Sequence, residues 1–437
     1  MADTILLKGI SHGSLPTLLA REPAVAFDPM TGNAQLFIGT PVGNQLVTGA
    51  AGAAGPAGPG AVGIVSTAPG PGLTAAKGDG ATDDTAALNA MIGAGQFGFV
   101  PVLIGTGLYP IATPLLLSRP SALDLSSNTI NVQSGFILRG LTSPAFQGLL
   151  TNGNMIRMTG TGQDSILQLG KGAVYSSLIE NISLDGGAAA LGTGNGIHTL
   201  YDYWSGLSLV NARIMNVGWD IWIDGALGGG NGEYLNAYNC YFHGRLGCYK
   251  NTSPSGQALV HTFTSCHSET DNGGTEFFLN NGQLNVFAWD CTQQPGTLPN
   301  VFLRLDETLT GRCNFVGGRC EHVDTLISWL GGSPQQFGTA SIEGIDFVGM
   351  SGTKAFLSGG GTNCNYRFVI KHCQFITQNP ISGALLLAIN SGGNEQIVFE
   401  DCDFIGWGGG YAQLSGNSHV TLVRCRYQDT SSVMHAL

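Results

Sequence analysis

The sequence predicts an all-β protein whose main body is a solenoid of stacked coils. Charged residues make up only 11% of the 437 residues, whereas glycine occurs 67 times, which suits a chain whose many coils each need tight turns. No amphipathic helix longer than a turn or two is evident after about Phe99. Instead, a small or apolar residue recurs at a mean interval of 27 residues, nine steps spanning the 243 residues from Ile182 to Cys425.

The length of the chain exceeds one ordinary globular core, and its charge excludes some partners. The formal net charge of −11 argues against binding nucleic acid or another polyanion through bulk charge. No signal peptide opens the chain, and prolines at 101, 110 and 114 interrupt the uncharged run of residues 99–118. We therefore expect a soluble protein, made in the cytoplasm, with no membrane insertion.

Residues 1–47 are expected to form a small β unit of their own. Runs of β-forming residues at 4–8, 23–27 and 35–39 are separated by turns rich in Gly, Pro and Asn. The patterns L-x-R-E-P-A-V-A-F at 19–27 and G-x-x-Q-L-F-I-G at 32–39 resemble the small N-terminal modules of phage tail fibres. That resemblance implies a trimeric module that attaches the protein to phage tail or baseplate proteins. A generic β-meander is the alternative, and so small a unit would need partners to bury enough surface.

Residues 48–74 are expected to form a neck or linker rich in Gly, Ala and Pro. Four consecutive G-X-Y triplets begin at Gly49, Gly52, Gly55 and Gly58. Gly at every third position is what three chains wound around one axis require, because only Gly fits beside that axis. With the N-terminal resemblance, the triplets favour a short collagen-like neck in a homotrimer. A flexible linker is the alternative, because four triplets are too few to be stable alone.

The stretch K-G-D-G-A-T-D-D-T-A-A-L-N-A-M-I at residues 77–92 predicts a turn followed by a helix. Thr82, Asp83 and Asp84 can accept hydrogen bonds from the first N–H groups of a helix at about residues 82–92. Apolar residues then form one face, and Gly93 and Gly95 are expected to end the helix. From these residues alone, the helix would lie over an apolar core and protect its end.

This stretch resembles the G-D-G-x-T-D-D-T-x-A motif at the start of the β-helix in pectate-lyase-like proteins and phage tailspikes. The likeness continues through residues 98–101 and 105–111, which follow that family's V-x-x-P-x-G-x-Y-x-I run with an altered spacing before Tyr109. The resemblance implies that residues 75–437 form a right-handed, single-stranded parallel β-helix of about a dozen coils. In that family the motif helps to cap the fold and is not the catalytic site, so Asp79, Asp83 and Asp84 are not assigned as catalysts.

The repeat predicts a strand, a tight turn and a second strand in each coil. Around most anchors, the residue three before is apolar, the residue before is polar and the residue two after is aromatic, as in N-C-Y-F and D-C-D-F. Period-2 alternation places the apolar residues inside. In the middle coils the aromatic residue is missing, which indicates either a shifted register or larger excursions from the coil. The aligned anchors are Ile182, Ile214, Cys240, Cys266, Cys291, Cys320, Ile345, Cys373, Cys402 and Cys425.

Seven of the ten cysteines are anchors, so we expect an internal ladder of small apolar side chains on coils about 4.8 Å apart. Cα atoms at that spacing could be bridged by disulfides. A chain without a secretion signal is made in a reducing cytosol, and we therefore expect free thiols. No C-x-x-C pair supports a zinc site, and neither a metal nor another cofactor is expected.

Outward-facing side chains of successive coils should form columns across the solenoid. Carboxylates and histidines gather on one face, near Tyr201, Tyr203 and three tryptophans. Aromatic faces beside carboxylates supply the stacking area and the acid–base pair that sugar binding and glycoside hydrolysis require. One expected column contains Asp185, Val217, His243, Glu269 and Gln294, and the other contains Tyr241, His267, Thr292, Glu321 and Asp346.

The candidate catalytic residues are Glu269, Asp271 and Glu321, as a general acid and its partner, with retaining and inverting mechanisms both open. A lyase would instead use His243, His267 or Tyr241 as the base and Arg245 to hold a uronate. The alternative to any active site is an ordinary solvated face, because some clustering is unavoidable among 29 acidic residues. The candidate substrate-binding residues are Trp204, Trp219, Trp222, His243, Arg245 and His267.

The resemblances together imply a phage tailspike or tail fibre, a homotrimer of the virion tail assembled in the host cytoplasm, that binds host surface polysaccharide and depolymerises it. A non-enzymatic receptor-binding or structural tail component is the alternative of a different class. A free bacterial polysaccharide lyase is a weaker alternative, because it leaves the neck and N-terminal unit unexplained. The sequence leaves open whether the protein is an enzyme and favours a hydrolase over a lyase. Because the sequence ends soon after Cys425, recognition is expected on the flank or distal tip of the β-helix.

Overall fold

The computed structural model divides the chain into two compact units, Met1–Ala61 and Val62–Leu437. The residues that it describes are 9–11, 23–27, 34–40, 43–46, 63–98, 100–117, 135–142, 153–160, 162–169, 174–187, 194–199, 202–225, 229–253, 260–306, 311–330, 336–351, 355–361, 364–381, 385–391, 395–407, 411–412, 415–416, 419–428 and 432–436.

The first unit contains a small sheet of four strands. The strands are β1 (Gly9–Ser11), β2 (Pro23–Phe27), β3 (Ala34–Thr40) and β4 (Gly43–Leu46). β1 pairs parallel with β2, whereas β2 with β3 and β3 with β4 are antiparallel. The expected strands at 23–27 and 35–39 are thus present, while the expected strand at 4–8 and the G-X-Y triplets lie outside the described residues.

The second unit begins earlier than the sequence predicted. The short strand β5 (Ile64–Val65) pairs parallel with β6 (Val102–Ile104), so part of the expected linker at 48–74 already belongs to the solenoid. The turn that follows is fixed by carboxylates. Asp84 accepts the N–H groups of Lys77 at 2.7 Å and Gly78 at 2.9 Å. These bonds give the G-D-G-x-T-D-D stretch a structural role.

The helix α1 (Thr85–Gly98) starts where Asp83 accepts the N–H of Thr85 at 3.0 Å, as expected for a capped helix. Its buried face contains Leu88, Met91 and Ile92. The prediction that glycines end this helix near residue 93 was wrong, because the helix continues to Gly98. A Cβ on Gly95 would lie 2.7 Å from the carbonyl oxygen of Val100, so this glycine allows the following chain to approach the helix closely.

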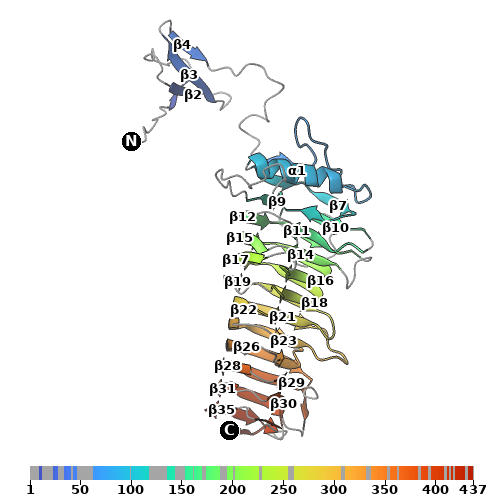
Figure 1. Cartoon of the computed structure of the whole chain (residues 1–437), viewed down its shortest axis with the longest axis vertical. Coiled ribbons are helices and arrows are strands. Elements are labelled where there is room, and N and C mark those ends of the chain that lie inside the picture. Colours follow the sequence, from blue (N-terminus) through green and yellow to red (C-terminus); the bar gives the residue numbers. More distant parts are fainter. Residues whose placement is uncertain are drawn as a thin grey trace. The chain divides into compact units, whose positions relative to one another are not determined.

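The rest of the unit is a parallel β-solenoid, which confirms the predicted all-β fold (Figure 1). Its strands stack in chain order as three columns, and each strand pairs in parallel with its neighbours in the preceding and following coils. The first column contains β5, β6, β9 (Ile137–Gly140), β12 (Val174–Glu180), β15 (Asp202–Val210), β17 (Gly229–Tyr238), β19 (Val260–Thr264), β22 (Gly282–Gln293), β24 (Gly311–Glu321), β26 (Gln336–Met350), β28 (Cys364–Lys371), β31 (Gln396–Glu400) and β35 (His419–Val423).

The second column follows the tight turn of each coil, and the third follows a further bend. The second contains β7 (Gly107–Ile111), β10 (Asn154–Met158), β13 (Ser183–Asp185), the first parts of β16 (Arg213–Ile223) and β18 (Tyr241–Asn251), β20 (His267–Thr270), the last parts of β22, β24 and β26, β29 (Gln374–Ile381), β32 (Asp403–Trp407) and β36 (Arg426–Gln428). The third contains β8 (Leu115–Leu116), β11 (Ser165–Leu169), β14 (Asn195–Thr199), the last parts of β16 and β18, β21 (Thr275–Leu279), β23 (Val301–Asp306), β25 (Thr325–Leu330), β27 (Leu357–Gly361), β30 (Leu385–Ser391), β33 (Tyr411–Ala412) and β34 (Ser415–Gly416). The strand β37 (Met434–Ala436) pairs antiparallel with β36.

The tight turn between the first two columns depends on one residue with positive φ. This position is occupied by Asn181, Asn211 and Asn239, with φ values of 55°, 48° and 51°. Asparagine tolerates this conformation better than most residues. The three side chains also bond to one another, since Asn211 Nδ2 donates to Asn181 Oδ1 at 3.2 Å and Asn239 Nδ2 donates to Asn211 Oδ1 at 2.7 Å.

The register of the middle coils differs from the predicted alignment by two residues. The structural equivalents of Cys240 and Cys266 in the next coils are Trp289 and Gly318, because His267 pairs with Asp290 and Trp289 pairs with Gly318. Cys291 and Cys320 therefore belong to the position two residues later. A shift of two keeps a side chain on the same face of a strand, so both cysteines still point inward.

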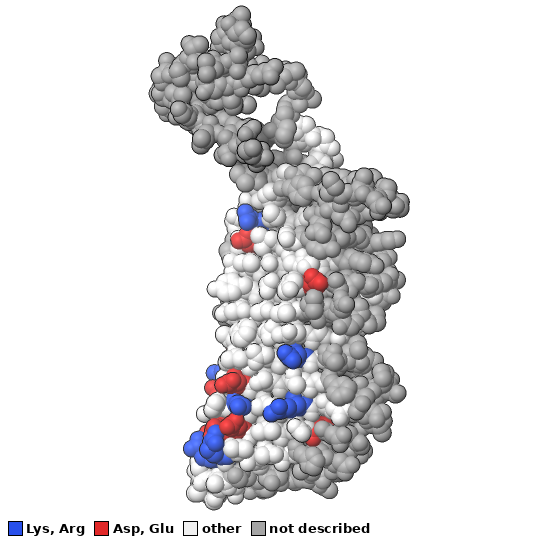
Figure 2. Space-filling model, turned by 60° about the vertical axis from the view of Figure 1, so that its left-hand side comes forward, with Lys and Arg blue, Asp and Glu red and all other residues white. Residues whose placement is uncertain are grey.

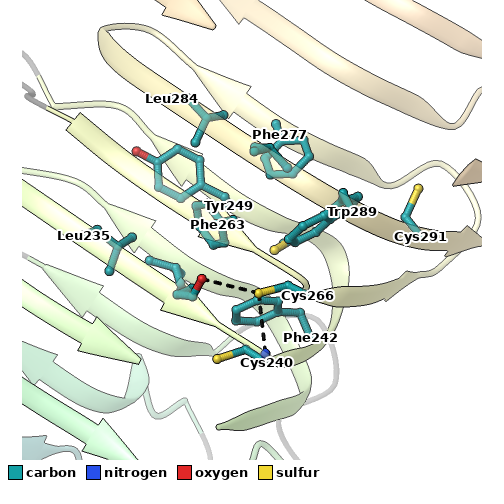
Figure 3. Packing of buried hydrophobic residues seen from close by; sticks show 14 of the residues in the cluster. Leu235, Cys240, Phe242, Tyr249, Phe263, Cys266, Phe277, Leu284, Trp289 and Cys291 are labelled. Atoms are coloured by element: carbon teal, nitrogen blue, oxygen red, sulfur yellow. Dashed lines mark hydrogen bonds between the residues drawn. The ribbon is translucent and has the colours of Figure 1, made fainter. Parts of the chain in front are cut away.

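The interior of these coils is packed with aromatic rings and cysteines (Figure 3). Phe263 contacts Phe277 with ring centroids 6.1 Å apart, and Phe277 contacts Trp289 at 5.0 Å. Burial of such large rings supplies much of the stability of a solenoid coil. The expected free thiols are confirmed for the nine cysteines whose side chains the structure describes, all of them buried and unbridged.

Candidate functional site

The predicted catalytic residues lie on the second column or at the bend that follows it, across four successive coils. β18, β20, β22 and β24 contribute two outward ladders there. The first ladder runs Tyr241, His267, Asp290 and Arg319, and the second runs His243, Glu269, Thr292 and Glu321. The structure thus replaces the expected columns, which had placed Thr292 and Glu321 beside Tyr241 and His267. The reason is the two-residue shift of β22 and β24. We call the residues Tyr241, His243, Arg245, His267, Glu269, Asp271, Asp290, Arg319 and Glu321 the Glu269 site.

Glu269 lies beside a tyrosine and a histidine. The Tyr241 hydroxyl donates to its carboxylate, and His267 Nε2 lies 3.6 Å from Glu269 Oε1. His267 Nδ1 lies 3.1 Å from Asp290 Oδ2, so its imidazole lies between two carboxylates. Burial raises the pKa of Tyr241, and the neighbouring Glu269 carboxylate raises it further, so this phenol stays protonated and remains a hydrogen-bond donor.

Asp271 belongs to a separate group of charges at the bend after β20. Arg245 Nε donates to Asp271 Oδ2 at 2.9 Å, and His243 Nε2 lies 3.8 Å from Asp271 Oδ1. The side chain of Asp271 is 31% exposed, and that of Arg245 is 42% exposed. This ion pair holds Asp271 in place, and it engages Arg245, the cation that the lyase hypothesis assigned to binding a uronate.

Glu321 is separated from Glu269 by Thr292, which lies between them in the same ladder. Arg319 Nη2 forms an ion pair with Glu321 Oε1 at 2.8 Å. Two coil steps of about 4.8 Å place the Cα atoms of the two glutamates about 10 Å apart. Both carboxylates are more than one third exposed, so a ligand lying across these coils could reach both.

The aromatic residues expected to stack on sugars are largely occupied by other side chains. Trp204 is 2% exposed and stacks on the buried His261 at 5.5 Å, and Trp219 is 9% exposed with its ring against the edge of Phe278. Trp222 lies between His198 of the preceding coil and Lys250 of the next, with its ring centroid 4.6 Å from the imidazole and 3.8 Å from the ammonium. These three tryptophans therefore do not form a free platform beside the Glu269 site. Tyr201 and the side chain of Tyr203 lie outside the described residues.

Two buried carboxylates under this surface were missed by the sequence analysis. Asp220 and Glu276 are both fully buried, and each has one oxygen without a hydrogen-bond partner. Asp220 accepts the N–H of His243 at 3.3 Å, and Ser268, next to Glu269, donates to Glu276. The sequence did contain a signal for them, because each is an acidic residue inside an apolar run, W-D-I-W-I for Asp220 and T-E-F-F-L for Glu276.

Burial is the main cause of the raised pKa values of these two carboxyl groups. It raises the pKa of Glu276 to about 7 and that of Asp220 well above its usual range, and the negative charge of Glu276 raises the pKa of Asp220 further. Gly244 makes room for Asp220, because a Cβ on this glycine would lie 2.8 Å from Asp220 Oδ2. Asp220 and Glu276 thus hold the backbone that carries His243 and Glu269.

The geometry suits acid–base chemistry by side chains. Within the described part of the chain, no group of three or more His, Cys, Asp or Glu residues could hold a metal ion. In the same residues, no helix is long and apolar enough to cross a membrane. Exposed carboxylates spaced along a ladder, each hydrogen-bonded or ion-paired to an orienting side chain, form an arrangement that can donate a proton to a bound substrate and activate water.

The comparison with known proteins defines the class of fold. No protein family matches the chain, and no curated protein matches it. Among solved structures, the DFA-IIIase of Arthrobacter chlorophenolicus A6 in complex with GF2 has a TM-score of 0.50 and 10% identity, covering 85% of this chain and 89% of that one. At this identity the likeness is one of fold, and it confirms the parallel β-helix expected from the sequence.

Two viral structures are also similar to the chain. The gp42 tailspike of Acinetobacter phage vb_AbaP_AS12 has a TM-score of 0.48 and 11% identity, covering 99% of this chain and 76% of that one. ORF18 of Geobacillus virus E2 has a TM-score of 0.45 and 16% identity, covering 91% and 74% of the two chains.

Proposed function

We propose that this protein is a bacteriophage tailspike that binds a host surface polysaccharide and cleaves it by glycoside hydrolysis. The G-D-G-x-T-D-D motif and the N-terminal pattern at residues 19–39 support a place in the virion tail, since both resemble parts of phage tail proteins. The G-X-Y triplets add the threefold neck that such a protein could carry. The observation that carries the enzymatic part is the ladder of Glu269, Thr292 and Glu321 on the outer surface of the solenoid.

The spacing of this ladder favours an inverting mechanism. Inverting glycosidases separate their two carboxyl groups by about 6.5–9.5 Å, which leaves room for a water molecule, whereas retaining enzymes need about 5 Å. Side chains that lean toward each other from Cα atoms about 10 Å apart reach the inverting range. Glu269 would protonate the glycosidic oxygen as the bond to the anomeric carbon breaks. Glu321 would take a proton from the water that attacks the opposite face of that carbon.

The neighbouring side chains have orienting roles in this proposal. Tyr241 and His267 hold the Glu269 carboxyl group, and Arg319 holds the side chain of Glu321 in place. Asp271, the other candidate from the sequence, is engaged by Arg245. Its role would be to keep the bend after β20 in place rather than to transfer a proton.

The test is a depolymerisation assay on extracted host polysaccharide, with chain length followed by size-exclusion chromatography. Glu269→Gln and Glu321→Gln should each lower the rate by about 100-fold or more, because each removes one proton-transfer group. Glu343→Gln is the matched control, since Glu343 is exposed, forms an ion pair with His372 and lies on another face. Shortening by wild type and both site variants at equal rates would move the active site elsewhere on the protein.

A second candidate function is a tail fibre that binds polysaccharide without cutting it. The observation in its favour is that the carboxylates of the Glu269 site already have partners: Tyr241 for Glu269, Arg245 for Asp271, His267 for Asp290 and Arg319 for Glu321. A polymer that co-elutes with the protein and keeps its length would support this function over hydrolysis.

The proposed quaternary structure is a homotrimer attached to the tail through residues 1–47. Figure 2 shows a side of the molecule on which charged side chains are sparse and gather mainly near the C-terminal coils. On the first column, Tyr238 is 55% exposed and Phe287 is 36% exposed, and such apolar side chains suit contacts between subunits. Light scattering at micromolar concentration should give three times the 45.4 kDa chain mass. A monomer mass would overturn the trimer.

A further inference from the structure

Thr292 lies between the two proposed catalytic glutamates. The strands β20, β22 and β24 place Glu269, Thr292 and Glu321 directly over one another in three successive coils. One coil step of about 4.8 Å separates the Cα atom of Thr292 from that of each glutamate. A molecule held between the two carboxyl groups therefore lies next to the side chain of Thr292.

The hydroxyl group of Thr292 has no partner in the protein. In the part of the chain that the structure describes, this half-buried side chain makes no hydrogen bond. Both glutamates, in contrast, are held by neighbours, Glu269 by Tyr241 and Glu321 by Arg319. A hydroxyl group can donate one hydrogen bond and accept two. This capacity is available at Thr292 for a ligand or a water molecule.

Local structure restricts where this hydroxyl group can lie. Thr292 belongs to the long strand β22, which pairs in parallel with β20 on one side and β24 on the other. Its chain neighbours Cys291 and Gln293 are fully buried, so the alternation of the strand directs Thr292 outward. A β-branched side chain also has few χ1 rotamers. The hydroxyl group is thus held close to one place, as an orienting group must be.

The proposed hydrolysis requires an ordered water molecule between the two glutamates. In an inverting reaction the separation of the carboxyl groups leaves room for this water, which attacks the anomeric carbon from the face opposite the leaving group. Glu321 can accept one proton of the water. A second contact is needed to aim the water oxygen at the carbon, because the rate depends steeply on this alignment. Thr292 is the residue of this ladder that can supply it.

We propose that Thr292 orients the water molecule that attacks the anomeric carbon. The inference rests on the proposed hydrolysis and adds a positioning residue to it. An electron pair of the water oxygen forms the bond to the carbon, and one water proton passes to Glu321. The bond from that carbon to the glycosidic oxygen breaks, its electron pair stays on the oxygen, and this oxygen takes the proton of Glu269. The hydroxyl oxygen of Thr292 accepts a hydrogen bond from the second water proton and keeps its own proton throughout.

The test compares Thr292→Val with Thr292→Ser in the depolymerisation assay, with kcat and KM measured separately. Valine keeps the shape but removes the hydroxyl group, so kcat should fall by about 10–100-fold while KM stays within about twofold of wild type. Serine keeps the hydroxyl group and should hold kcat within about fivefold of wild type. A packing role would give the opposite order, because serine is the smaller residue and valine has the shape of threonine.

Thr262→Val is the matched control, because Thr262 is also a half-buried threonine but lies in β19 on the first column. It should leave kcat and KM unchanged. A double substitution then tests whether Thr292 acts on the same water as Glu321. Groups that act as a unit have non-additive effects, so Thr292→Val should lower kcat by less than about threefold in the Glu321→Gln background.

Proton NMR of the first product should show an inverted anomeric configuration. A wild-type kcat for Thr292→Val, a raised KM with unchanged kcat, a full additional loss in the Glu321→Gln background or a retained configuration would each overturn the role of Thr292. If Glu269→Gln and Glu321→Gln lower the rate and Thr292→Val does not, the hydrolase stands and only this role fails. The absence of cleavage by wild type would overturn both.

Discussion

The buried carboxylate of Asp220 accepts the backbone N–H of His243 with an Oδ1–N distance of 3.3 Å, and so links the interior of the solenoid to the Glu269 site. Burial, together with the nearby charge of Glu276, raises the pKa of Asp220 well above its usual range. A pKa raised in this way favours the protonated acid, whose Oδ1 can still serve as an acceptor.

Substitution of Asp220 should show that it acts as a neutral hydrogen-bonding group. Asp220→Asn keeps the shape and the acceptor oxygen, so its free energy of unfolding should stay within about 1 kcal/mol of wild type. Asp220→Ala leaves buried N–H groups without an acceptor and should cost about 1–3 kcal/mol. Urea unfolding followed by circular dichroism measures both. Equal damage by the two variants would show that Asp220 is ionised in the native state.

Glu276 should make the protein less stable as the pH rises. Its pKa is about 7 in the folded chain and 4.5 in the unfolded chain, so between these values the unfolded state binds fewer protons. The contribution of Glu276 is therefore fully present below pH 4.5 and is lost as the pH rises through about 7. The difference of about 2.5 units corresponds to roughly 3 kcal/mol.

The measurement is the free energy of unfolding of wild type and Glu276→Gln from pH 4.5 to 8.5. As the pH rises, the free energy of unfolding of Glu276→Gln should increase relative to that of wild type. This difference should stop changing above pH 8. His261→Gln serves as a comparison variant. Burial lowers the pKa of His261 to about 4, so this residue changes the free energy of unfolding on the acid side of neutrality. Parallel curves for wild type and Glu276→Gln would contradict the buried, protonatable state of Glu276.

The parts of the fold that the sequence predicted are those set by local chemistry. Alternating apolar residues define strands, and the residue before each anchor must tolerate a tight turn, so the coils were recognisable from the sequence. Register was not fully predictable, because a shift of two residues at Cys291 and Cys320 preserves the inward pattern. A shift of one would have exposed every core side chain and been recognised at once.

The candidate site was less predictable, because its contacts come from different coils. Glu269 and Glu321 share a ladder only because β22 and β24 are shifted by two residues relative to the predicted alignment. The spacing of the cysteines does not indicate this shift. The tryptophans look like sugar-stacking residues in the sequence. Their ring faces are occupied by His198, His261 and Lys250, which approach from neighbouring coils or columns.

The asparagine ladder at the tight turn should contribute measurably to stability. Asn211→Gly keeps a residue that accepts the φ of 48° but removes the side-chain bonds to Asn181 and Asn239. It should lower the free energy of unfolding by about 1–2 kcal/mol. Asn211→Ala removes the same bonds and adds the strain of a positive φ, for about 1 kcal/mol more. Equal stability of the two variants would mean that backbone strain plays no part at this turn.

The cysteines should be unreactive in the native protein and all free after unfolding. The nine described thiols are buried and unbridged, and burial is the main cause that raises the pKa of Cys313 to about 12, where little thiolate forms at neutral pH. A thiol reagent such as Ellman's should therefore react only slowly with these nine thiols in the native chain. After denaturation in urea, all ten cysteines should react. Fewer than ten would reveal a disulfide, and several fast thiols in the native state would mean that the coils open readily.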